Sequence, residues 1–220
     1  VLAKASAICG PYRVRAFEVI AGKGETETTH HEHGCAYRLD VAKVYFSPRL
    51  AYEHARVSSQ VKENEVVLDM FAGVGPFSIL IAKKYNRIKV YAIDINPVAI
   101  QYLKQNMLLN KVQSRVIPLQ GDAGKLVEAQ LVGIIDRVIM NLPAEAIAYV
   151  DVACKALKPE GGIIHYYEIV AEPNPLGKAK EKFSEAVSRT GRKIERFLAE
   201  RTVKQTAPHE WQVVIDAIIR

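Results

Sequence analysis

The chain has 220 residues, of which 49% are hydrophobic and 25% are charged, the balance of a globular protein. This length predicts one medium domain, or one such domain with a small appendage. No apolar run reaches the roughly 18 residues that a transmembrane helix needs, so none is expected. The start at Val1-Leu2-Ala3-Lys4 has neither an initiator Met nor a signal-peptide layout, which predicts a chain that begins inside a longer protein.

The charge and the cysteines narrow the class further. Lys and Arg outnumber Asp and Glu by 30 to 24, and the net charge of +6 is compatible with a phosphate-bearing partner, although many solvated surfaces are similarly charged. Cys9, Cys35 and Cys154 are odd in number and far apart, which argues against a disulfide framework or a CxxC metal site. We therefore expect a protein of the reducing cytoplasm.

Residues 1–50 contain strand-like segments at Tyr12–Ala21 and Glu25–Leu39, and His33-Gly34 indicates a turn within the second. No helical period appears before Arg49, and a helix is predicted at about Leu50–Gln60. We therefore predict a small β-rich N-terminal module over residues 1–50, followed by a second domain over residues 51–220.

From about Val61 onward, short strands alternate with amphipathic helices. The predicted strands are Glu65–Asp69, Ile88–Ile93, Arg115–Leu119, Asp136–Met140 and Gly161–Tyr167. Helices are predicted at Pro76–Lys84, from Asn96-Pro97 onward, before Lys158-Pro159, and at Leu176–Arg189. This alternation predicts an α/β fold around a parallel sheet.

Two more strands are predicted near Ile194–Thr202 and Glu210–Ile218. The segment between them is too short for a helix, so they should form an antiparallel pair at one edge of the sheet. A mostly parallel sheet with an antiparallel edge strand suits a Rossmann-like class I methyltransferase fold better than a dinucleotide-binding oxidoreductase.

The loop after the predicted strand Glu65–Asp69 is suited to binding a ligand. Asp69 stands at the strand end, and the small residues after it allow a ligand to approach the backbone closely. A tight βα turn is the alternative interpretation, and the missing GxGxxG spacing argues against a nicotinamide cofactor. The candidate cofactor loop comprises Asp69, Phe71, Ala72, Gly73, Val74 and Gly75.

Acidic residues also end the next two strands. Asp94 lies about 25 residues further on, where its carboxylate can accept both hydroxyls of a ribose. Asp122 follows the third strand, where an acid can reach an adenine amino group. Three acids at successive strand ends predict a site for S-adenosylmethionine, to which we also assign Ile95, Asn96, Gly121 and Ala123.

Asn141-Leu142-Pro143 follows the fourth strand. Methyltransferases that act on base nitrogens often have an Asn/Asp-Pro-Pro-like turn there, whose polar groups receive the target base beside the methyl donor. Asn-x-Pro is also a favourable turn in its own right. Because sites of open α/β sheets lie at the carboxyl ends of the strands, Asn141 is a candidate for contact with both the base and the cofactor.

Six stretches spread over nearly the whole chain have a familiar order: Gly10-Pro11-Tyr12-Arg13-Val14-Arg15, Lys43-Val44-Tyr45-Phe46-Ser47-Pro48-Arg49, Asp69 to Phe77, Asp94-Ile95-Asn96-Pro97, Asn141-Leu142-Pro143 and His165-Tyr166-Tyr167. In them the sequence resembles the archaeal and eukaryal tRNA guanine-N1-methyltransferases that modify the guanosine 3′ of the anticodon. Members of this family have a further N-terminal domain that helps recognise the tRNA elbow, and the resemblance covers only the β-rich and catalytic parts.

The resemblance implies roles for single residues. Glu53 matches the carboxylate that takes the proton from guanine N1, which is a poor nucleophile until that proton leaves. Arg13 matches the arginine that neutralises the charge growing on the guanine carbonyl oxygen. Asn141 would hold the base, and Pro143 would shape its turn. Outside this context, a lone Glu on a helix or a lone Arg on a strand is usually a surface charge.

Two further residues are assigned to the cofactor through the same resemblance. Tyr45 lies where the family has a residue that borders the methionine and base pocket, and Arg56 follows Glu53 in the same stretch. The sequence departs from the family at His54, where many members have an arginine, and at Ala144, where a lysine is common. These departures concern contacts with tRNA more than the chemistry.

Two charged clusters give weaker signals. In His30-His31-Glu32-His33, alternate strand residues share a face, so His31 and His33 could bind a metal, but no second ligand cluster lies nearby and we expect none. The C-terminal third is rich in cations, which form either a solvated face or a surface for an RNA backbone. These cations are Lys178, Lys180, Lys182, Arg189, Arg192, Lys193, Arg196 and Arg201.

Together these features predict an S-adenosylmethionine-dependent tRNA methyltransferase that binds the anticodon stem-loop, acts as a monomer and needs no membrane. One alternative is a wybutosine-pathway enzyme that transfers the aminocarboxypropyl group or methylates a tricyclic intermediate. Asn141-Leu142-Pro143 and the pair of Arg13 and Glu53 favour methyl transfer to guanine. The other alternative is a non-catalytic RNA-binding module, against which the acids at the strand ends argue.

Overall fold

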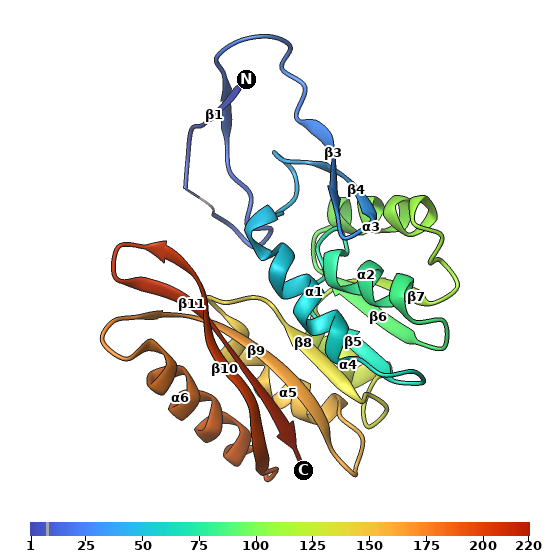
Figure 1. Cartoon of the computed structure of the whole chain (residues 1–220), viewed down its shortest axis with the longest axis vertical. Helices are drawn as coiled ribbons and strands as arrows, with labels where there is room; N and C mark the ends of the chain where they lie inside the picture. Colours follow the sequence, from blue (N-terminus) through green and yellow to red (C-terminus); the bar gives the residue numbers. More distant parts are fainter. Residues whose placement is uncertain (8) are drawn as a thin grey trace.

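The computed structural model describes residues 1–7 and 9–220 (Figure 1). Seven strands form the main sheet in the order β10-β11-β9-β8-β5-β6-β7. The five strands from β9 to β7 run parallel, whereas β11 pairs antiparallel with both β9 and β10, so the predicted antiparallel edge pair is confirmed. The strands are β5 (Val66–Asp69), β6 (Lys89–Asp94), β7 (Val116–Gln120), β8 (Arg137–Met140), β9 (Gly162–Ala171), β10 (Ile194–Ala207) and β11 (Glu210–Ile219).

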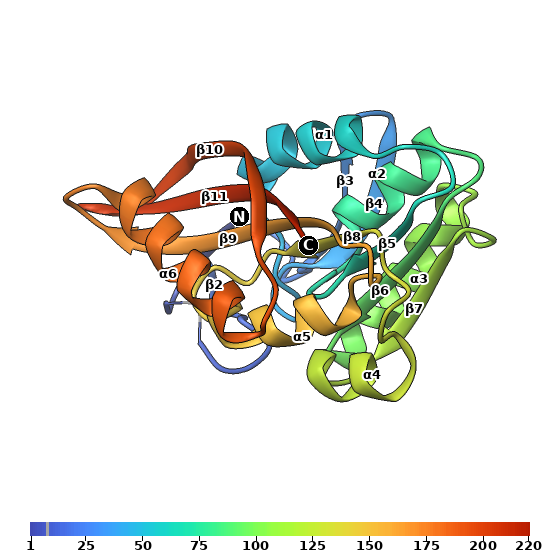
Figure 2. The same ribbon diagram turned by 90° about the horizontal axis from the view of Figure 1, so that it is seen from below.

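Helices cover both faces of this sheet (Figure 2). On one face, Ile79 and Leu103 belong to a buried core that also includes residues of α1 and β6. On the other face, Val127 and Phe183 belong to a second core with residues of α5 and β11. The helices are α1 (Ala51–Gln60), α2 (Pro76–Lys84), α3 (Pro97–Leu109), α4 (Ala123–Gln130), α5 (Val150–Ala156) and α6 (Pro175–Arg189), with short 3-10 helices η1 (Pro48–Leu50) and η2 (Ala146–Tyr149). Within the described residues, none of these helices is long and apolar enough to cross a membrane.

Local signals in the sequence determine where the helices begin. The side chain of Asn96 accepts a hydrogen bond from the backbone N–H of Val98 at 2.9 Å, which caps the start of α3. Gly75 precedes α2 with a φ of 93°, and a Cβ at this position would collide with the Leu103 side chain. A side chain at Gly75 would therefore disturb both the turn and the packing of α3.

Two hairpins precede the main sheet: β1 (Leu2–Lys4) pairs with β2 (Phe17–Val19), and β3 (Glu27–Glu32) pairs with β4 (Cys35–Asp40). The predicted turn at His33-Gly34 is confirmed, and both residues have a positive φ, of 48° and 72°. The strand predicted over Tyr12–Ala21 is wrong in its length. Only its last part pairs with β1, because the chain turns with a positive φ at Gly10 and Arg13.

The hairpin of β3 and β4 packs on the larger domain. Cys35 and Tyr37 are fully buried in the core beneath α2 and α3. The Asn110 side chain accepts a hydrogen bond from Ala36 N at 3.0 Å and donates one to Ala36 O at 2.7 Å, so α3 holds the edge of β4. The hairpin of β3 and β4 therefore shares a core with α2 and α3, and the domain boundary predicted at residue 50 stays a prediction.

Candidate active site

The loop after β5 and the end of β6 form one structural unit at the carboxyl edge of the sheet. Ala72 N donates to Ile93 O at 2.7 Å, and Gly73 N donates to the carboxylate of Asp94 at the same distance. Gly73 has a φ of 56°, in the region that favours glycine. The predicted cofactor loop and the predicted ribose ligand are thus joined directly.

Asp94 presents a partly buried carboxylate at this edge. Its two oxygens accept one backbone hydrogen bond each, from Gly73 N at 2.7 Å and Asn96 N at 2.8 Å. Burial raises the pKa of Asp94 above its usual value. Each carboxylate oxygen has a second lone pair, so the group can accept two more hydrogen bonds. These acceptors fit the two hydroxyls of a ribose.

Asp69 lies beneath the loop and is fully buried. One of its oxygens accepts a hydrogen bond from Ser78 Oγ at 2.7 Å, while the other has no hydrogen-bond partner among the described residues. Burial raises the pKa of Asp69 to about 7. The oxygen without a partner fits a donor such as a ligand amino group, and the bonded one secures the first turn of α2.

Asp122 combines an acid with an apolar surface at the end of β7. One oxygen accepts a hydrogen bond from Lys125 N at 3.0 Å and caps α4, and the other lies 3.5 Å from the Tyr149 hydroxyl. The Tyr149 ring packs edge-on against Phe71 with the ring centres 5.1 Å apart, and Ile95 is exposed beyond β6. A purine with an amino group fits this combination.

The other predicted cofactor residues support this edge from inside. Gly121 N donates to Asp94 O at 3.0 Å, which joins the ends of β6 and β7. Val74 and Ala123 are buried, and Asn96 is occupied as the cap of α3. These residues shape this edge of the sheet more than they present polar groups at it.

Asn141 and Pro143 stand at the end of β8 and are anchored to the neighbouring strands. The buried Gln212 of β11 donates from its side-chain amide to Asn141 Oδ1 at 3.2 Å. Ile169 N of β9 donates to Pro143 O at 3.0 Å. Because Gln212 engages the carbonyl oxygen of the Asn141 amide, the NH₂ group of Asn141 is left to donate to another molecule.

A groove of about 660 Å³ opens beside this turn. Segments far apart in the sequence line it, including the first hairpin, the stretch before α1, and strands β10 and β11. Pro143 and Gln212 belong to its lining, so the groove adjoins the turn that holds Asn141. The lining residues include no Asp or Glu among the described part of the chain, but they include the cations Lys4, Arg13, Arg15, Arg49 and Lys204.

Arg13 and Tyr45, both predicted from the sequence, meet in this groove. The Arg13 guanidinium carbon lies 5.8 Å from the centre of the Tyr45 ring. Burial and the nearby charges of Arg49 and Arg13 lower the pKa of Lys204, whose Nζ donates to Ser47 Oγ at 3.2 Å. The groove is therefore a concentrated positive surface with an aromatic side chain in it.

Glu53 lies in the first turn of α1, four residues after Arg49, and is 1% exposed. Its Oε2 accepts hydrogen bonds from the Tyr167 hydroxyl and from Arg56 Nε, both at 2.9 Å. Its Oε1 lies 3.2 Å from a guanidinium nitrogen of Arg201 on β10. Two hydrogen-bond donors and one further cation therefore surround the carboxylate that the sequence proposes as the proton acceptor.

The guanidinium of Arg56 is bound to Glu53. Its guanidinium also binds both oxygens of Asp216 on β11. Asp216 in turn accepts a hydrogen bond from His165 Nδ1 at 2.7 Å, and His165 Nε2 accepts one from Arg137 at 2.8 Å. Two buried acids thus hold this guanidinium, and the cofactor contact predicted for Arg56 stays a prediction.

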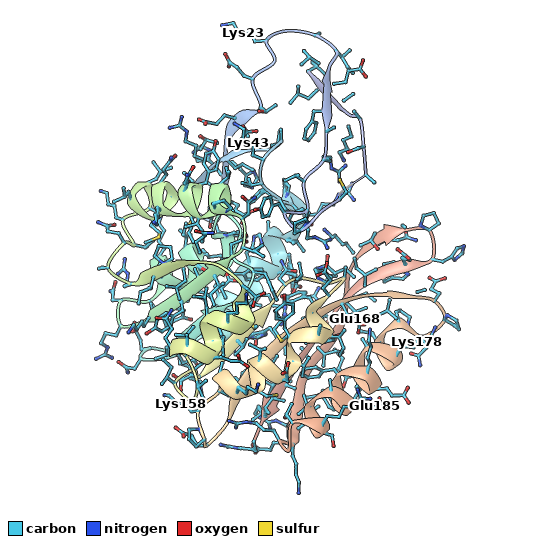
Figure 3. The ribbon with its side chains drawn as sticks, turned by 180° about the vertical axis from the view of Figure 1, so that it is seen from behind. Lys23, Lys43, Lys158, Glu168, Lys178 and Glu185 are labelled. Atoms are coloured by element: carbon cyan, nitrogen blue, oxygen red, sulfur yellow. The ribbon has the colours of Figure 1, made fainter. Side chains whose placement is uncertain are left out.

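The cations of the C-terminal third are mostly engaged within the chain. Lys180 pairs with Glu200, Lys182 with Glu168, and Arg189 with Glu185. Figure 3 shows Lys178 and Glu185 on α6, away from Lys23 in the segment that joins β2 to β3. Pairing with acids reduces the attraction of these three cations for an RNA backbone, and the RNA-binding surface suggested for the whole set stays a prediction.

The histidine cluster of β3 also has partners within the chain. Glu32 bridges His30 at 3.1 Å and His54 of α1 at 2.6 Å. His33 contacts the carbonyl oxygen of Ala51 at 2.7 Å. In the described part of the chain, no group of three or more His, Cys, Asp or Glu side chains is arranged to hold a metal ion. The cluster thus attaches the hairpin to the start of α1.

Sequence reasoning missed several residues of the groove, among them Arg49, Lys204 and Gln212. Arg49 is part of a stretch that carries the family resemblance, so this signal was available. Lys204 and Gln212 come from strands β10 and β11, and they face each other in the pairing register. Only the antiparallel register, which the sequence does not specify residue by residue, brings them to the site.

The order of the seven strands, the acids at successive strand ends and the anchored Asn-Leu-Pro turn define a class I methyltransferase domain. A family model described as the TRM5/TYW2 methyltransferase domain matches residues 28–195, and the chain belongs to this family.

Two curated relatives and one solved structure illustrate the likeness. The chain is 47% identical over 214 residues to the tRNA (guanine(37)-N(1))-methyltransferase Trm5b of Pyrococcus abyssi, covering 97% of the chain and 62% of that relative. It is 39% identical over 210 residues to the tRNA(Phe) (4-demethylwyosine(37)-C(7)) aminocarboxypropyltransferase of Methanocaldococcus jannaschii, covering 96% of the chain and 82% of that relative. The structure of M. jannaschii TYW2 in complex with AdoMet has a TM-score of 0.83 at 38% identity, covering 93% of the chain and 90% of that protein. The chain thus spans about three fifths of the length of the Pyrococcus relative.

Proposed function

We propose that this chain transfers a methyl group from S-adenosylmethionine to N1 of guanosine 37 in tRNA, the reaction named for the P. abyssi relative. The placement of Asn141 supports this proposal most. Asn141 directly follows β8 and is held by Gln212, which itself lines the basic groove. A cofactor at Asp94 and Asp122 and a base at Asn141 would therefore meet at one edge of the sheet.

The residues at the carboxyl ends of β5, β6 and β7 fit the cofactor group by group. Asp94 would accept hydrogen bonds from the two ribose hydroxyls, and Asp122 would accept one from the adenine amino group. Phe71 and Ile95 would contact the faces of the adenine ring. When bound, S-adenosylmethionine supplies a methyl group attached to a positively charged sulfur. This sulfur is a good leaving group because it becomes a neutral thioether.

The groove fits an RNA strand. Its five cations and the absence of acids among its described lining suit a phosphate backbone, which provides most of the sequence-independent affinity of such complexes. Tyr45 offers an aromatic ring beside these cations, and unstacked bases of RNA loops bind on such rings. We therefore assign the anticodon loop of tRNA to this groove.

The reaction requires removal of a proton. The N1–H bond of guanine breaks, the proton passes to the carboxylate of Glu53, and the electron pair left on N1 attacks the methyl carbon as its bond to sulfur breaks. Arg13 would neutralise the charge on the guanine carbonyl oxygen, and Asn141 would orient the base. These residues position the reactants and move the proton.

A second candidate is aminocarboxypropyl transfer, the activity named for the M. jannaschii relative. It would use the same cofactor site with a different group on the sulfur, and methylation of a tricyclic wybutosine intermediate is a further variant. The pairing of Glu53 as proton acceptor with Arg13 favours transfer to guanine N1, because only this nitrogen must first lose a proton in that way.

Product analysis distinguishes these candidates. The chain is incubated with S-adenosylmethionine and an unmodified tRNA transcript, and the digested nucleosides are analysed by mass spectrometry. The expected product is guanosine with one added methyl group, absent from a transcript with adenosine at position 37. The much heavier aminocarboxypropyl product would support the second candidate. Cofactor binding without transfer to any transcript would indicate a non-catalytic RNA-binding module.

We infer that the chain acts as a monomer in the reducing cytoplasm. Cys9, Cys35 and Cys154 are all free thiols, and the last two are buried among apolar side chains. Sedimentation of the chain with and without a thiol reductant tests this inference. A species of twice the mass at micromolar concentration, in either condition, would contradict it.

A further inference from the structure

The two oxygens of the Glu53 carboxylate differ in their surroundings. Oε2 accepts directed hydrogen bonds from Tyr167 and Arg56, two side chains that are themselves buried or nearly so. Oε1 is buried and accepts no directed hydrogen bond, although a nitrogen of Arg201 lies 3.2 Å away. Oε1 is therefore the oxygen with lone pairs left for a proton from a substrate.

Arg201 is the partner of Glu53 that can leave most readily. Its side chain is 34% exposed, compared with 11% for Arg56, and it lies on the edge strand β10. Arg56 is also tied to Asp216, whereas Arg201 has Glu53 as its acidic partner and rests on the exposed ring of Tyr52, 4.5 Å from the ring centre. Its departure would leave the buried network unbroken.

The position of Arg201 relative to the groove suggests what would displace it. Lys204 lies three residues further along β10 and lines the groove, a separation of about 10 Å along a strand. A register shift between Thr202 and Lys204 interrupts the regular alternation of faces. A phosphate bound in the groove would thus lie within reach of the long Arg201 side chain, and a guanidinium binds phosphate oxygens through paired hydrogen bonds.

We propose that Arg201 covers Oε1 of Glu53 in the RNA-free chain and that a phosphate of the bound RNA draws it away. This proposal rests on the proposed function. Oε1 then accepts the proton as the N1–H bond of guanine breaks, and the electron pair remains on N1. Arg201 is a positioning residue: it couples the arrival of RNA to the exposure of the proton acceptor.

The proposal predicts that one phosphate of the RNA affects the chemical step through Arg201. Stem-loop RNAs with a single uncharged methylphosphonate linkage at each loop position are methylated under single-turnover conditions at saturating RNA. In the unsubstituted chain, one linkage should slow transfer by about tenfold or more, the effect of one lost charge-assisted hydrogen bond. In Arg201→Met the same linkage should change the rate by less than about twofold, since the variant has no guanidinium to displace.

Two further variants control the comparison. Arg201→Lys keeps a cation and should remain sensitive to the same linkage. Arg196→Met removes an equal charge from an exposed position of the same strand and should behave like the unsubstituted chain. Thermal unfolding and cofactor affinity of each variant verify that it is folded.

The outcomes separate this proposal from the proposed function. Equal sensitivity of Arg201→Met and the unsubstituted chain at every linkage, or no sensitive linkage at all, overturns the role of Arg201 while methylation of guanine N1 stands. A lack of methylation of the unmodified RNA by the unsubstituted chain overturns the proposed function, and the role of Arg201 with it.

Discussion

At the scale of single residues, Asp94 has a double function. It fixes the loop through Gly73 N and Asn96 N, and it keeps two lone pairs for a ligand. Replacement of Asp94 by Ala should therefore weaken cofactor binding by roughly 2–4 kcal/mol, the contribution of two overlapping charge-assisted hydrogen bonds. Isothermal titration calorimetry with S-adenosylmethionine measures this loss.

An exposed acid away from these strand ends provides the control for the Asp94→Ala variant. Asp151 is exposed on α5, and Asp151→Ala should bind the cofactor like the unsubstituted chain. Unchanged affinity in Asp94→Ala would rule out the ribose assignment. Thermal unfolding shows whether a loss of affinity reflects only the loop that Asp94 supports.

Glu53 is expected to act on the chemical step alone. Glu53→Gln keeps an oxygen that can accept from Tyr167 and Arg56 but cannot take up a proton. Single-turnover methyl transfer should slow by about a hundredfold to ten-thousandfold, with cofactor and RNA affinity retained. Glu63→Gln, at an exposed acid beyond the same helix, is the control. A Glu53→Gln rate within about threefold of the unsubstituted chain would sink the assignment.

Arg13 and Glu53 should act on the same transition state. Arg13→Ala should slow transfer by about a hundredfold or more, a typical loss for an oxyanion partner. The double variant should lose less than the product of the two single losses, because residues that act as a unit are not additive. Rates are compared at saturating RNA and cofactor, and full multiplicativity would show that the two residues act independently.

At the scale of elements, strands β9 and β11 carry a buried, hydrogen-bonded pair of His165 and Asp216 that makes stability depend on pH. Burial lowers the pKa of His165, and the charges of Arg137 and Arg56 lower it further, against the opposing effect of Asp216. The pKa of Asp216 is held well below its usual value by His165 and Arg56 despite its burial. His165 is therefore neutral in the folded chain and donates from Nδ1 to Asp216.

The sign of the effect follows from linkage. Above the pKa of histidine in the unfolded chain, about 6.5, His165 is neutral in both the folded and the unfolded chain. Its titration then takes nothing from the free energy of unfolding. Below this pKa, the histidine binds a proton in the unfolded chain but stays neutral in the folded chain, so the free energy of unfolding falls as the pH falls. Asp216 contributes stability above the unfolded pKa of aspartate, about 3.9, and loses it only at lower pH. His165 thus dominates this pair between pH values of about 7.5 and 5.5.

Urea unfolding at two pH values measures this contribution. Between pH values of about 7.5 and 5.5, the unsubstituted chain should lose about 1 kcal/mol more unfolding free energy than His165→Gln, which cannot titrate. The difference between the two chains is needed because Asp69, with a pKa raised to about 7, has the opposite effect in this range. Parallel pH profiles for the two chains would contradict a buried neutral His165.

The elements that the sequence predicted well are those with local signals. Pro76–Lys84 has both predicted bounds, because glycine and proline mark its start and the apolar pattern its length. α3 begins at Pro97, directly after its predicted Asn96 cap. The acids Asp94 and Asp122 could be placed for a similar reason, since parallel strands bring their carboxyl ends to one edge whatever the details of packing.

The features that the sequence did not predict depend on contacts between distant segments. The β1 strand was missed because its three residues pair only with β2, across a turn of unusual backbone conformation. The Glu53 network depends on α1 lying over β9 and β11, which places Arg56 on Asp216. The local sequence around Arg56 resembles that of any amphipathic helix, so it could not show that two acids hold this guanidinium.

At the scale of the whole molecule, positive charge is distributed in two different ways. On α6, Lys180, Lys182 and Arg189 are paired with acids, which reduces their attraction for an RNA backbone. In the groove between the first hairpin and the sheet, five cations face an opening without acids among the described lining. The net charge of +6 therefore understates how strongly one face of the chain attracts phosphate.

This distribution predicts how RNA binding should respond to salt. Each phosphate contact contributes a slope of about −0.7 to −0.9 to the dependence of log affinity on log salt concentration, because binding releases counterions. The affinity of the chain for an anticodon stem-loop should therefore fall steeply between low and physiological salt, and Lys204→Met should reduce the slope by nearly one phosphate contact. Lys182→Met removes an equal charge that is already paired with Glu168, so its slope should stay close to that of the unsubstituted chain. Fluorescence anisotropy over a salt series measures all three slopes. A flat profile for the unsubstituted chain, or equal slopes for Lys204→Met and the unsubstituted chain, would show that the RNA does not bind in this groove.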